Sequence, residues 1–435
     1  MKQSLPAAGP QINFLENRLI MGIFLLAAAF NGWGVSIGWN NPNLYGNEFR
    51  QTQTAISAHF IQEEHNFSLA YPTPVLGKPW SIPFEFPLYQ WTVVAVSNFG
   101  DLPLTTAGRL VGAVCFYAGL PALFLLLRRL RLTESNCLVV LSLVLTCPLY
   151  IFYARAFLIE TMALMFGLWY LAALVKTIEQ RNFGWLILVN LAGIGAGLVK
   201  VTTFIVFVLP AFACSLGWLW QSRPRVGISK WSTLFRTTGW LVASHALAFT
   251  ATLWWLHFSD SVKFLNPNGA AFTSVRSTAF TFGTGHRFDP STWRDHWRII
   301  REEIASPSTL VTGILVALLF ARRQWLLIVS FVGLYLLAQS IFPILYAAHT
   351  YYHVASAFLL ICALGFALIG TFENARLSRA IPFALWAMFI GLQMWTYFKV
   401  DYPIQRTTGN KGGLVVALTV HQHQGGYRLR LHQFK

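Results

Sequence analysis

Charged residues are scarce in this sequence of 435 residues. Asp, Glu, Lys and Arg make up 11% of it, and 55% of the residues are hydrophobic, whereas soluble domains average about 25% charged residues. A chain with so few charges cannot cover a normal water-facing surface. The hydrophobic residues also lie in continuous blocks, which is typical of a polytopic helical membrane protein.

Acidic residues are rarer still, with 16 Asp and Glu against 32 Lys and Arg, for a formal net charge of +16. This excess does not indicate nucleic acid as a partner, because the basic residues form short clusters between apolar blocks, as the positive-inside rule predicts. The five cysteines lie in or beside apolar runs without metal-ligand spacing. We interpret them as apolar packing residues and expect neither disulfides nor a metal site.

Internal symmetry is absent as well. Transporters that work by alternating access often carry inverted repeats and interrupted helices in matching halves, and this sequence shows no such repeat.

The first apolar block is long and is followed by Trp33 and Trp39 rather than by a small-residue cleavage site. We therefore expect a retained helix and not a cleaved signal peptide.

A membrane-spanning helix needs roughly 20 apolar residues, and the blocks predict about eleven such helices in an all-α chain. Their boundaries are soft, particularly between Trp185 and Trp220, where only Lys200 divides two runs. The predicted helices centre near residues 27, 115, 144, 167, 190, 209, 247, 315, 334, 360 and 389.

The basic clusters fall on every second connection between these helices, so one topology accommodates all of them. It places the N-terminus in the cytoplasm and the C-terminus outside. The clusters are Arg128, Arg129 and Arg131; Lys176 and Arg181; Arg223, Arg225, Lys230 and Arg236; Arg322 and Arg323; and Arg376 and Arg379.

The same topology divides the chain into a transmembrane domain, residues 1–400, and a short polar tail, residues 401–435. Two long loops of the domain, at about 36–103 and 259–307, then lie on the outer side together with the tail. We therefore expect the functional groups to face outward.

The first outer loop begins with the polar stretch "NEFRQTQTAISAHF". Drawn as a helix, it places Phe49, Ile56 and Phe60 in a narrow apolar stripe with polar residues on both flanks. This pattern predicts a helix lying in the membrane interface, with Glu48 near the headgroups. An interfacial spacer with solvated charges is the alternative.

The proline-rich segment "YPTPVLGKPWSIPFEFPLYQW" follows, and its prolines exclude a regular helix in its first half. Glu85 lies there in a mostly apolar setting. A carboxylate near lipid is costly unless it is paired or hydrated, so Glu48 and Glu85 are both candidate acids or bases. The alternative for Glu85 is a salt bridge to Lys78 or a hydrated interface charge.

Cations near the outer helix ends suit a phosphate on a lipid tail. The candidates are Arg50, Lys78, Arg155 and Lys200, with His349, Tyr351 and Tyr352 beside them. Each has a structural alternative. Arg155 could pair with Glu160, Lys200 could mark a turn, and His349 with His353 could bind zinc.

These motifs together resemble the membrane-embedded glycosyltransferases that use lipid-linked sugars, with the fold of dolichyl-phosphate-mannose–protein mannosyltransferases and aminoarabinose transferases. The likeness rests on "NE" at Asn47 and Glu48, "GKPW…FPLYQW", "AGRL" with Arg109, "ARAFLIE", "LVKVTTF" and "HTYYHVASAF". Their order covers most of the chain from about residue 15 to 400.

The resemblance implies a GT-C fold and transfer of a sugar from a polyprenyl-phosphate donor to a lipid, glycan or protein acceptor. It also implies an integral protein of the bacterial inner membrane, with its active site on the outer face and inversion at the sugar. Glu48 takes the role of general base and Glu85 is a second catalytic candidate. Arg50, Lys78, Arg155 and Lys200 would bind phosphate, and His349, Tyr351 and Tyr352 would line the donor site. No cofactor is implied, and Asn47 departs from the Asp usual there.

Two other function classes stay open. A transporter or flippase of lipid-linked sugars would share the outward cations but predicts charges deep within its helices. A catalytically decayed scaffold would fit Asn47 and the short tail. We interpret the tail, without a clear element pattern, as a truncated, shifted or disordered end.

Overall fold

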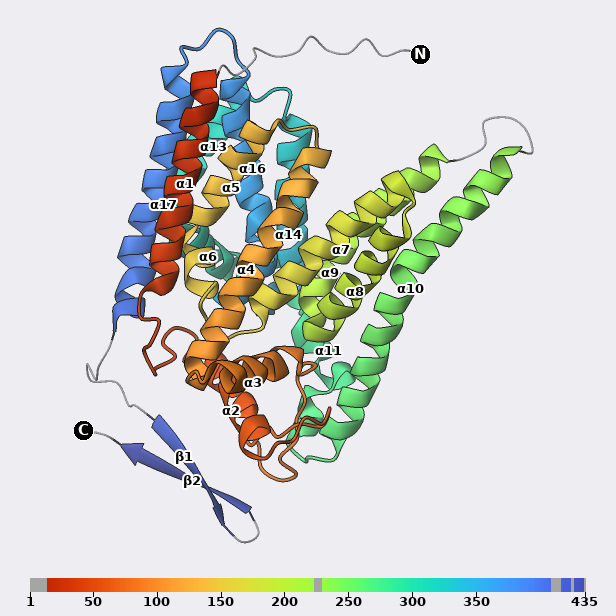
Figure 1. Cartoon of the computed structure of the whole chain (residues 1–435), viewed down its shortest axis with the longest axis vertical. Coiled ribbons are helices and arrows are strands. Elements are labelled where there is room, and N and C mark those ends of the chain that lie inside the picture. Colours follow the sequence, from red (N-terminus) through yellow and green to blue (C-terminus); the bar gives the residue numbers. More distant parts are fainter. Residues whose placement is uncertain (1–13, 223–228, 408–415, 424–425, 434–435) are drawn as a thin grey trace.

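The computed structural model describes residues 14–222, 229–407, 416–423 and 426–433. The described residues form a helical bundle, and the connections between its helices lie at its two opposite ends (Figure 1). The apolar helices of the bundle are α1 (Phe14–Ser36), α4 (Leu104–Arg129), α5 (Glu134–Thr146), α7 (Glu160–Gln180), α8 (Phe183–Val199), α9 (Val201–Gln221), α10 (Ser229–Phe264), α13 (Pro307–Phe320), α14 (Trp325–Ile341), α16 (Ala357–Phe372) and α17 (Ala380–Arg406).

All eleven predicted helix centres lie within these helices. Six of the helices are long and apolar enough to cross a membrane, and a seventh span is possible if the bent pair Pro290–Ile304 and Pro307–Phe320 is counted. Four more apolar helices in the described residues are shorter than 18 residues. The polytopic helical class is thus confirmed, while the number of crossings stays a prediction.

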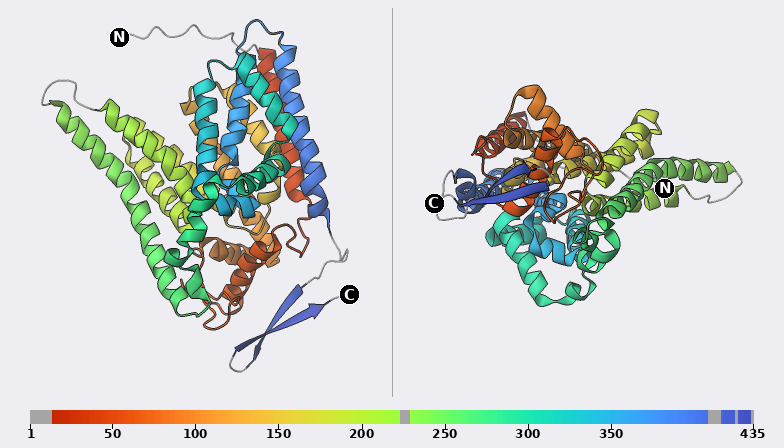
Figure 2. Two further views of the ribbon diagram at one scale, coloured as in Figure 1. Left: turned by 180° about the vertical axis from the view of Figure 1, so that it is seen from behind. Right: turned by 90° about the horizontal axis from the view of Figure 1, so that it is seen from below.

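Helix α16 forms the centre of the larger helix group. Every one of its residues is buried, and its sequence is apolar all round, as expected of a helix enclosed by others. Around it pack α5, α13, α14 and α17 (Figures 1 and 2).

A second group, α7 to α10, leans away from the first (Figures 1 and 2). Glycines of α8 permit its close packing: a Cβ on Gly197 would lie 1.9 Å from Thr252 Oγ1 of α10, and a Cβ on Gly193 would lie 2.8 Å from Ala248 Cβ. Small residues commonly bring helices of membrane proteins together in this way.

The short basic connections and the long loops lie at opposite ends of the bundle (Figure 1). The connections α4–α5, α7–α8, α13–α14 and α16–α17 are at the end where the picture marks the N-terminus. The segment between α1 and α4, the segment between α10 and α13 and the start of α16 are at the other end, which we call the loop end. This separation agrees with the charge pattern.

The loop end carries short helices. They are α2 (Glu48–Glu63), α3 (Leu88–Gly100), α6 (Pro148–Tyr153), η1 (Gly269–Phe272), α11 (Ser274–Phe282), η2 (Thr284–Phe288), α12 (Pro290–Ile299), η3 (Ile300–Ile304), α15 (Pro343–Ala348) and η4 (Thr350–Ala355). Helix α2 matches the predicted stretch, and α3 begins only after the proline-rich segment ends.

The tail differs from its interpretation as a segment without elements. Helix α17 continues to Arg406, past the expected boundary at residue 401. Strands β1 (Val416–His423) and β2 (Gly426–Gln433) then pair antiparallel, with Leu418 opposite Leu431. Two alternating segments separated by glycine form a hairpin pattern, which the sequence reading overlooked.

Candidate active site

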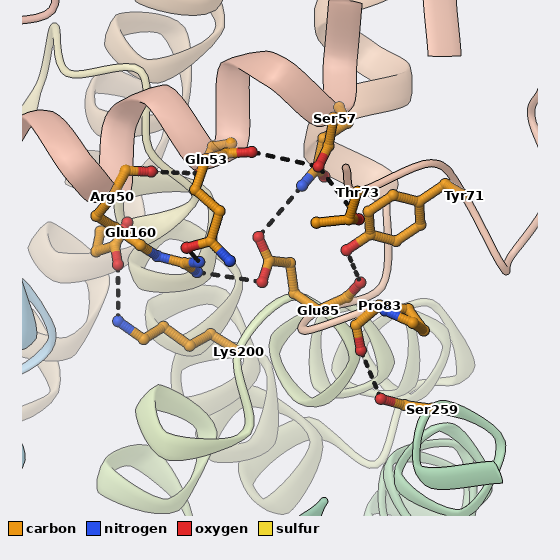
Figure 3. A network of polar contacts seen from close by, with 12 residues as sticks. Arg50, Gln53, Ser57, Tyr71, Thr73, Pro83, Glu85, Glu160, Lys200 and Ser259 are labelled. Carbon is orange, nitrogen blue, oxygen red and sulfur yellow. Dashed lines mark hydrogen bonds and ion pairs between the residues drawn. The ribbon is translucent and has the colours of Figure 1, made fainter. Parts of the chain in front are cut away.

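Two buried ion pairs face each other at the loop end (Figure 3). The first joins Arg50 of α2 to Glu85 of the segment before α3, with Arg50 Nη2 3.1 Å from Glu85 Oε2. Glu85 is 6% exposed, and its other oxygen accepts a hydrogen bond from Gln90 Nε2 at 3.2 Å. Arg50 also donates to Gln53 Oε1 at 3.0 Å. The partner of Glu85 is therefore Arg50, and not Lys78 as the alternative proposed.

The second pair joins Lys200 to Glu160, with Nζ 2.7 Å from Oε1. Lys200 occupies a break of extended backbone between α8 and α9, and Glu160 is the first residue of α7. Both residues are buried, at 8% and 2% exposure. A buried pair of this kind is retained only when each charge compensates the other, because removal from water is costly.

Aromatic side chains of η4 cover the second pair. Lys200 Nζ lies 4.0 Å from the ring centre of Tyr352 and 5.0 Å from that of Tyr351. His349 stacks on Tyr351 with ring centres 5.1 Å apart. The predicted residues Lys200, His349, Tyr351 and Tyr352 thus lie together.

Electrostatic coupling shows that the two pairs form one cluster. Burial disfavours the charged form of Arg50, but Glu85, and then Glu160, Tyr351 and Tyr352, raise its pKa above the ordinary value. Burial lowers the pKa of His349, and Lys200 and Arg50 lower it further. We call Arg50, Glu85, Glu160 and Lys200 the four-charge cluster. Burial lowers the pKa of Lys200, and the charge of Glu160 opposes that shift. The two cations of the cluster help to keep His349 neutral near pH 7.

Glu48 lies two residues before Arg50 and is exposed. Its Oε1 accepts a hydrogen bond from the backbone N–H of Gly46 at 3.0 Å. In the described part of the chain no cation forms an ion pair with it. Glu85 and Glu160 each neutralise a buried cation, whereas Glu48 does not.

Asn47 ties α2 to η4. Its backbone has the left-handed conformation (φ 56°), which Asn tolerates better than most residues. Its Nδ2 donates to Tyr153 Oη at 2.6 Å and to Thr350 Oγ1 at 3.0 Å. An amide supplies two donors in this position, whereas an ionised Asp would supply none.

We predict that Asn47→Ala lowers the free energy of unfolding by about 1–3 kcal/mol, because both hydrogen bonds are lost and Ala is less favourable at this φ. Thermal unfolding of the purified protein measures the change. Asn40→Ala, which changes an exposed amide after α1, serves as the control and should change stability by less than about 0.5 kcal/mol. Equal effects of the two substitutions would contradict a stabilising role for the hydrogen bonds of Asn47.

The three residues of the apolar stripe predicted for α2 differ in exposure and do not form one buried face. Phe49 is 82% exposed and Phe60 is 5% exposed, with Ile56 between these values. The buried face carries Gln51, Gln53, Thr54 and Ser57 instead. Tertiary packing overrides the local pattern here, because neighbouring segments supply hydrogen-bond partners for the polar face. Gln51 Nε2 donates to the carbonyl oxygen of Tyr45 at 3.1 Å, and Ser57 Oγ lies 3.4 Å from Thr73 Oγ1.

Lys78 and Arg155 do not belong to the four-charge cluster. Lys78 is exposed in the segment before α3. Arg155 lies in the connection between α6 and α7 and donates to the carbonyl oxygen of Gly38 at 3.0 Å. It does not pair with Glu160, which holds Lys200.

His353 has a structural role. Its Nδ1 is 3.1 Å from Tyr335 Oη and its Nε2 is 3.0 Å from the carbonyl oxygen of Tyr346. Both ring nitrogens are engaged within the protein, so in this arrangement His353 offers no free nitrogen for a zinc site with His349. Among the described residues there is no group of three or more His, Cys, Asp or Glu that could hold a metal ion.

Sequence reasoning missed the roles of Gln53, Gln90 and Tyr71. Gln53 and Gln90 orient the Arg50–Glu85 pair, and Tyr71 Oη donates to the carbonyl oxygen of Glu85 at 2.9 Å (Figure 3). The spacing of Arg50 and Gln53, three residues apart on the predicted helix, was a signal that could have paired them. No such spacing rule connects Gln90 and Tyr71 to the pair.

A separate pair of carboxyl groups lies near Tyr153. They are Glu303 of η3 and Asp401 of α17, which lie close enough to interact electrostatically. Burial raises the pKa of Glu303 from 4.5 to about 7, and the charge of Glu302 adds to the shift.

This raised pKa predicts a pH-dependent stability. Between about pH 4.5 and 7 the folded protein binds more protons than the unfolded chain, so the contribution of Glu303 is complete below pH 4.5 and is lost as the pH rises through 7. The unfolding temperature should therefore fall from pH 5 to pH 8, and Glu303→Gln should reduce that fall. Glu63→Gln, which changes an exposed carboxylate at the end of α2, should retain it. An unchanged slope in Glu303→Gln would refute the prediction.

Comparison with known proteins finds the fold but no sequence relative. No protein-family model and no curated protein sequence matches the chain. Similar solved structures include ArnT from Cupriavidus metallidurans bound to undecaprenyl phosphate, with a TM-score of 0.52 at 15% identity over 85% of this chain. The oligosaccharyltransferase of Archaeoglobus fulgidus in the apo form gives 0.53 at 11% identity over 91%. The arabinofuranosyltransferase AftD from Mycobacteria gives 0.50 at 16% identity over 92%.

The chain spans only part of each of these proteins, namely 62%, 56% and 28% of their respective lengths. The identities are too low to carry over an activity, but the agreement of three separate structures over most of this chain is an agreement of fold. The chain is a polytopic helical membrane protein with the GT-C fold of these glycosyltransferases.

Proposed function

We propose that this protein transfers a sugar from a polyprenyl-phosphate donor to an acceptor at the outer face of the membrane. The observation that carries the proposal is the four-charge cluster at the loop end of a GT-C fold, covered by Tyr351 and Tyr352. Similarity to an ArnT structure with bound undecaprenyl phosphate supports the choice of a lipid phosphate.

Arg50 and Lys200 are the proposed ligands of the donor phosphate. A guanidinium group has five N–H donors and an ammonium group has three, and the known bonds of Arg50 and Lys200 use only some of them. The carboxylates of Glu85 and Glu160 hold the cations in place and leave donors for phosphate oxygens. Lys78 would approach the same phosphate from the exposed segment, and His349, Tyr351 and Tyr352 would form the wall of the donor site.

Glu48 is the proposed general base. The acceptor hydroxyl attacks the anomeric carbon, the bond from that carbon to the phosphate oxygen breaks, and polyprenyl phosphate leaves with the bonding electrons. Glu48 takes the proton of the hydroxyl, which its exposure and its freedom from ion pairing allow. Glu85 is less suited to the role because Arg50 stabilises its charged form.

The charge pattern supports the proposed orientation. Basic residues gather in the short connections at the end opposite to the loop end, and such connections tend to remain in the cytoplasm. The four-charge cluster would then face outward, in the inner membrane of a bacterium, with the N-terminus in the cytoplasm.

A transfer assay tests the proposal. Purified protein in nanodiscs receives radiolabelled polyprenyl-phosphate sugars, or the corresponding nucleotide sugars, with lipid, glycan and peptide acceptors. We expect label in an acceptor from the lipid donor only. Transfer from nucleotide sugars alone would refute the donor class, and movement of the donor between leaflets without any transfer would favour a flippase.

A further inference from the structure

A polar pocket lies beside the first turn of α2. Arg155 and Arg109 line it together with Gln51 of α2 and Gln405 of α17. We call it the Arg155 pocket. Its remaining lining residues are Asn41, Asn43, Leu44, Tyr45, Phe152, Ala156 and Ile404.

The two arginines hold the segment between α1 and α2. Arg109 Nη1 donates to the carbonyl oxygens of Trp39 and Asn41, and its Nη2 to that of Asn43 at 3.0 Å. Arg155 Nη2 donates to Gly38, whose φ of +66° and closeness to Gln405 leave no room for a Cβ. Backbone carbonyls satisfy these donors but do not neutralise two charges.

No acidic residue lines the pocket. Within the described chain neither arginine has a carboxylate partner, and Asp401, one turn before Gln405 on α17, does not line the pocket. Two buried guanidinium groups, at 2% and 8% exposure, thus stand without a compensating negative charge, which is a costly arrangement unless an anion supplies it.

Two donors of the pocket also have no hydrogen-bond partner among the described residues. They are Arg155 Nε and Gln405 Nε2, and Gln405 is 2% exposed. Both residues line the same pocket. A buried unpaired donor is unusual in a folded protein, and two of them beside uncompensated positive charge call for an acceptor with several oxygens.

We propose that the Arg155 pocket is a second phosphate-binding site, separate from the Arg50–Lys200 site. The role of this site rests on the proposed function: the pocket recognises an acceptor with an anionic phosphate headgroup. Planar guanidinium groups match the oxygens of phosphate. Gln51 lines this pocket, whereas its neighbour Arg50 belongs to the four-charge cluster, so both sites adjoin the first turn of α2. The pocket is narrow, so phosphate enters it with a shift of the Arg155 or Gln405 side chain.

Binding measured without any sugar donor tests this site independently of the transfer reaction. Calorimetry on the full chain in nanodiscs of neutral lipid uses inorganic phosphate in one arm and short-chain phosphatidic acid in the other. We expect Arg155→Gln to weaken binding of one or both ligands about 10- to 100-fold, the value of one to two charge-assisted hydrogen bonds. Phosphatidic acid bound alone identifies a lipid headgroup as the source, and inorganic phosphate bound alone identifies a free ion; both support phosphate chemistry.

Two further variants keep the test decisive. Gln405→Leu removes an unpaired donor without changing the charge and should weaken binding less than Arg155→Gln does. Arg50→Gln should leave this binding in place, and the exposed Arg376→Gln at the opposite end of the bundle is the matched control for loss of one charge. The proposal is overturned if Arg155→Gln and Gln405→Leu bind both ligands as tightly as Arg376→Gln does, or if Arg50→Gln alone abolishes binding.

Discussion

Glu48→Gln is expected to lower the turnover number of sugar transfer by roughly 100- to 10,000-fold, the usual contribution of a general base. Gln retains the oxygen that accepts the backbone N–H of Gly46, so the start of α2 should keep its conformation. Donor binding should also be unchanged, because Glu48 neutralises neither Arg50 nor Lys200. Initial rates with saturating lipid donor measure the effect.

The matched control is Glu63→Gln, an exposed carboxylate at the last residue of the same helix. It removes the same charge far from the cluster and should leave the rate within twofold of the unaltered protein. If Glu48→Gln transfers sugar as fast as Glu63→Gln, Glu48 is not the base, and Glu85 or Glu160 would have to take that role.

Lys200→Met is expected to have the largest effect on stability. Met fills a similar volume but leaves Glu160 buried at 2% exposure without its cation. Breaking a buried pair in this way costs about 3–5 kcal/mol. The midpoint of thermal or denaturant-induced unfolding should fall accordingly, and binding of polyprenyl phosphate should weaken at the same time.

A double substitution separates the two effects. In Lys200→Met with Glu160→Gln no unpaired charge remains, so much of the lost stability should return, whereas phosphate binding should stay weak. Lys176→Met breaks the exposed pair with Glu179 and should cost less than about 1 kcal/mol. Full recovery of phosphate binding in the double variant would mean that Lys200 has a structural role alone.

The helices could be predicted from the sequence because their signal is local. Each apolar block is long, and each predicted centre lies in an apolar helix of the structure. The start of α2 and the late start of α3 also follow from local residues, namely the polar stretch from Asn47 and the prolines before Leu88. The residues within each segment were sufficient to predict these helix positions.

The partners of the charged residues could not be predicted, because they come from distant segments. Arg50 and Glu85 are 35 residues apart, and Glu160 and Lys200 are 40 apart. Local spacing offered Lys78 as an alternative partner for Glu85 and Arg155 for Glu160, whereas the structure pairs Glu85 with Arg50 and Glu160 with Lys200. The folded arrangement of α2, α7 and the break at Lys200 decides the pairing.

Asn47 shows a different limit. The resemblance raised the absence of Asp at this position as a sign of impaired chemistry, whereas the structure assigns the Asn side chain to Tyr153 and Thr350. Its contribution is a contact between α2 and η4, which only the tertiary structure reveals. Glu48 next to it remains free for the proposed chemistry.

The most direct test of the central claim is an experimental structure of the protein with polyprenyl phosphate bound in a nanodisc. The phosphate is expected within hydrogen-bonding distance of Arg50 and Lys200, beside the rings of Tyr351 and Tyr352, with the lipid tail running into the bilayer. A phosphate bound at the opposite end of the bundle, or a four-charge cluster that makes no contact with the lipid at saturating concentration, would contradict the account.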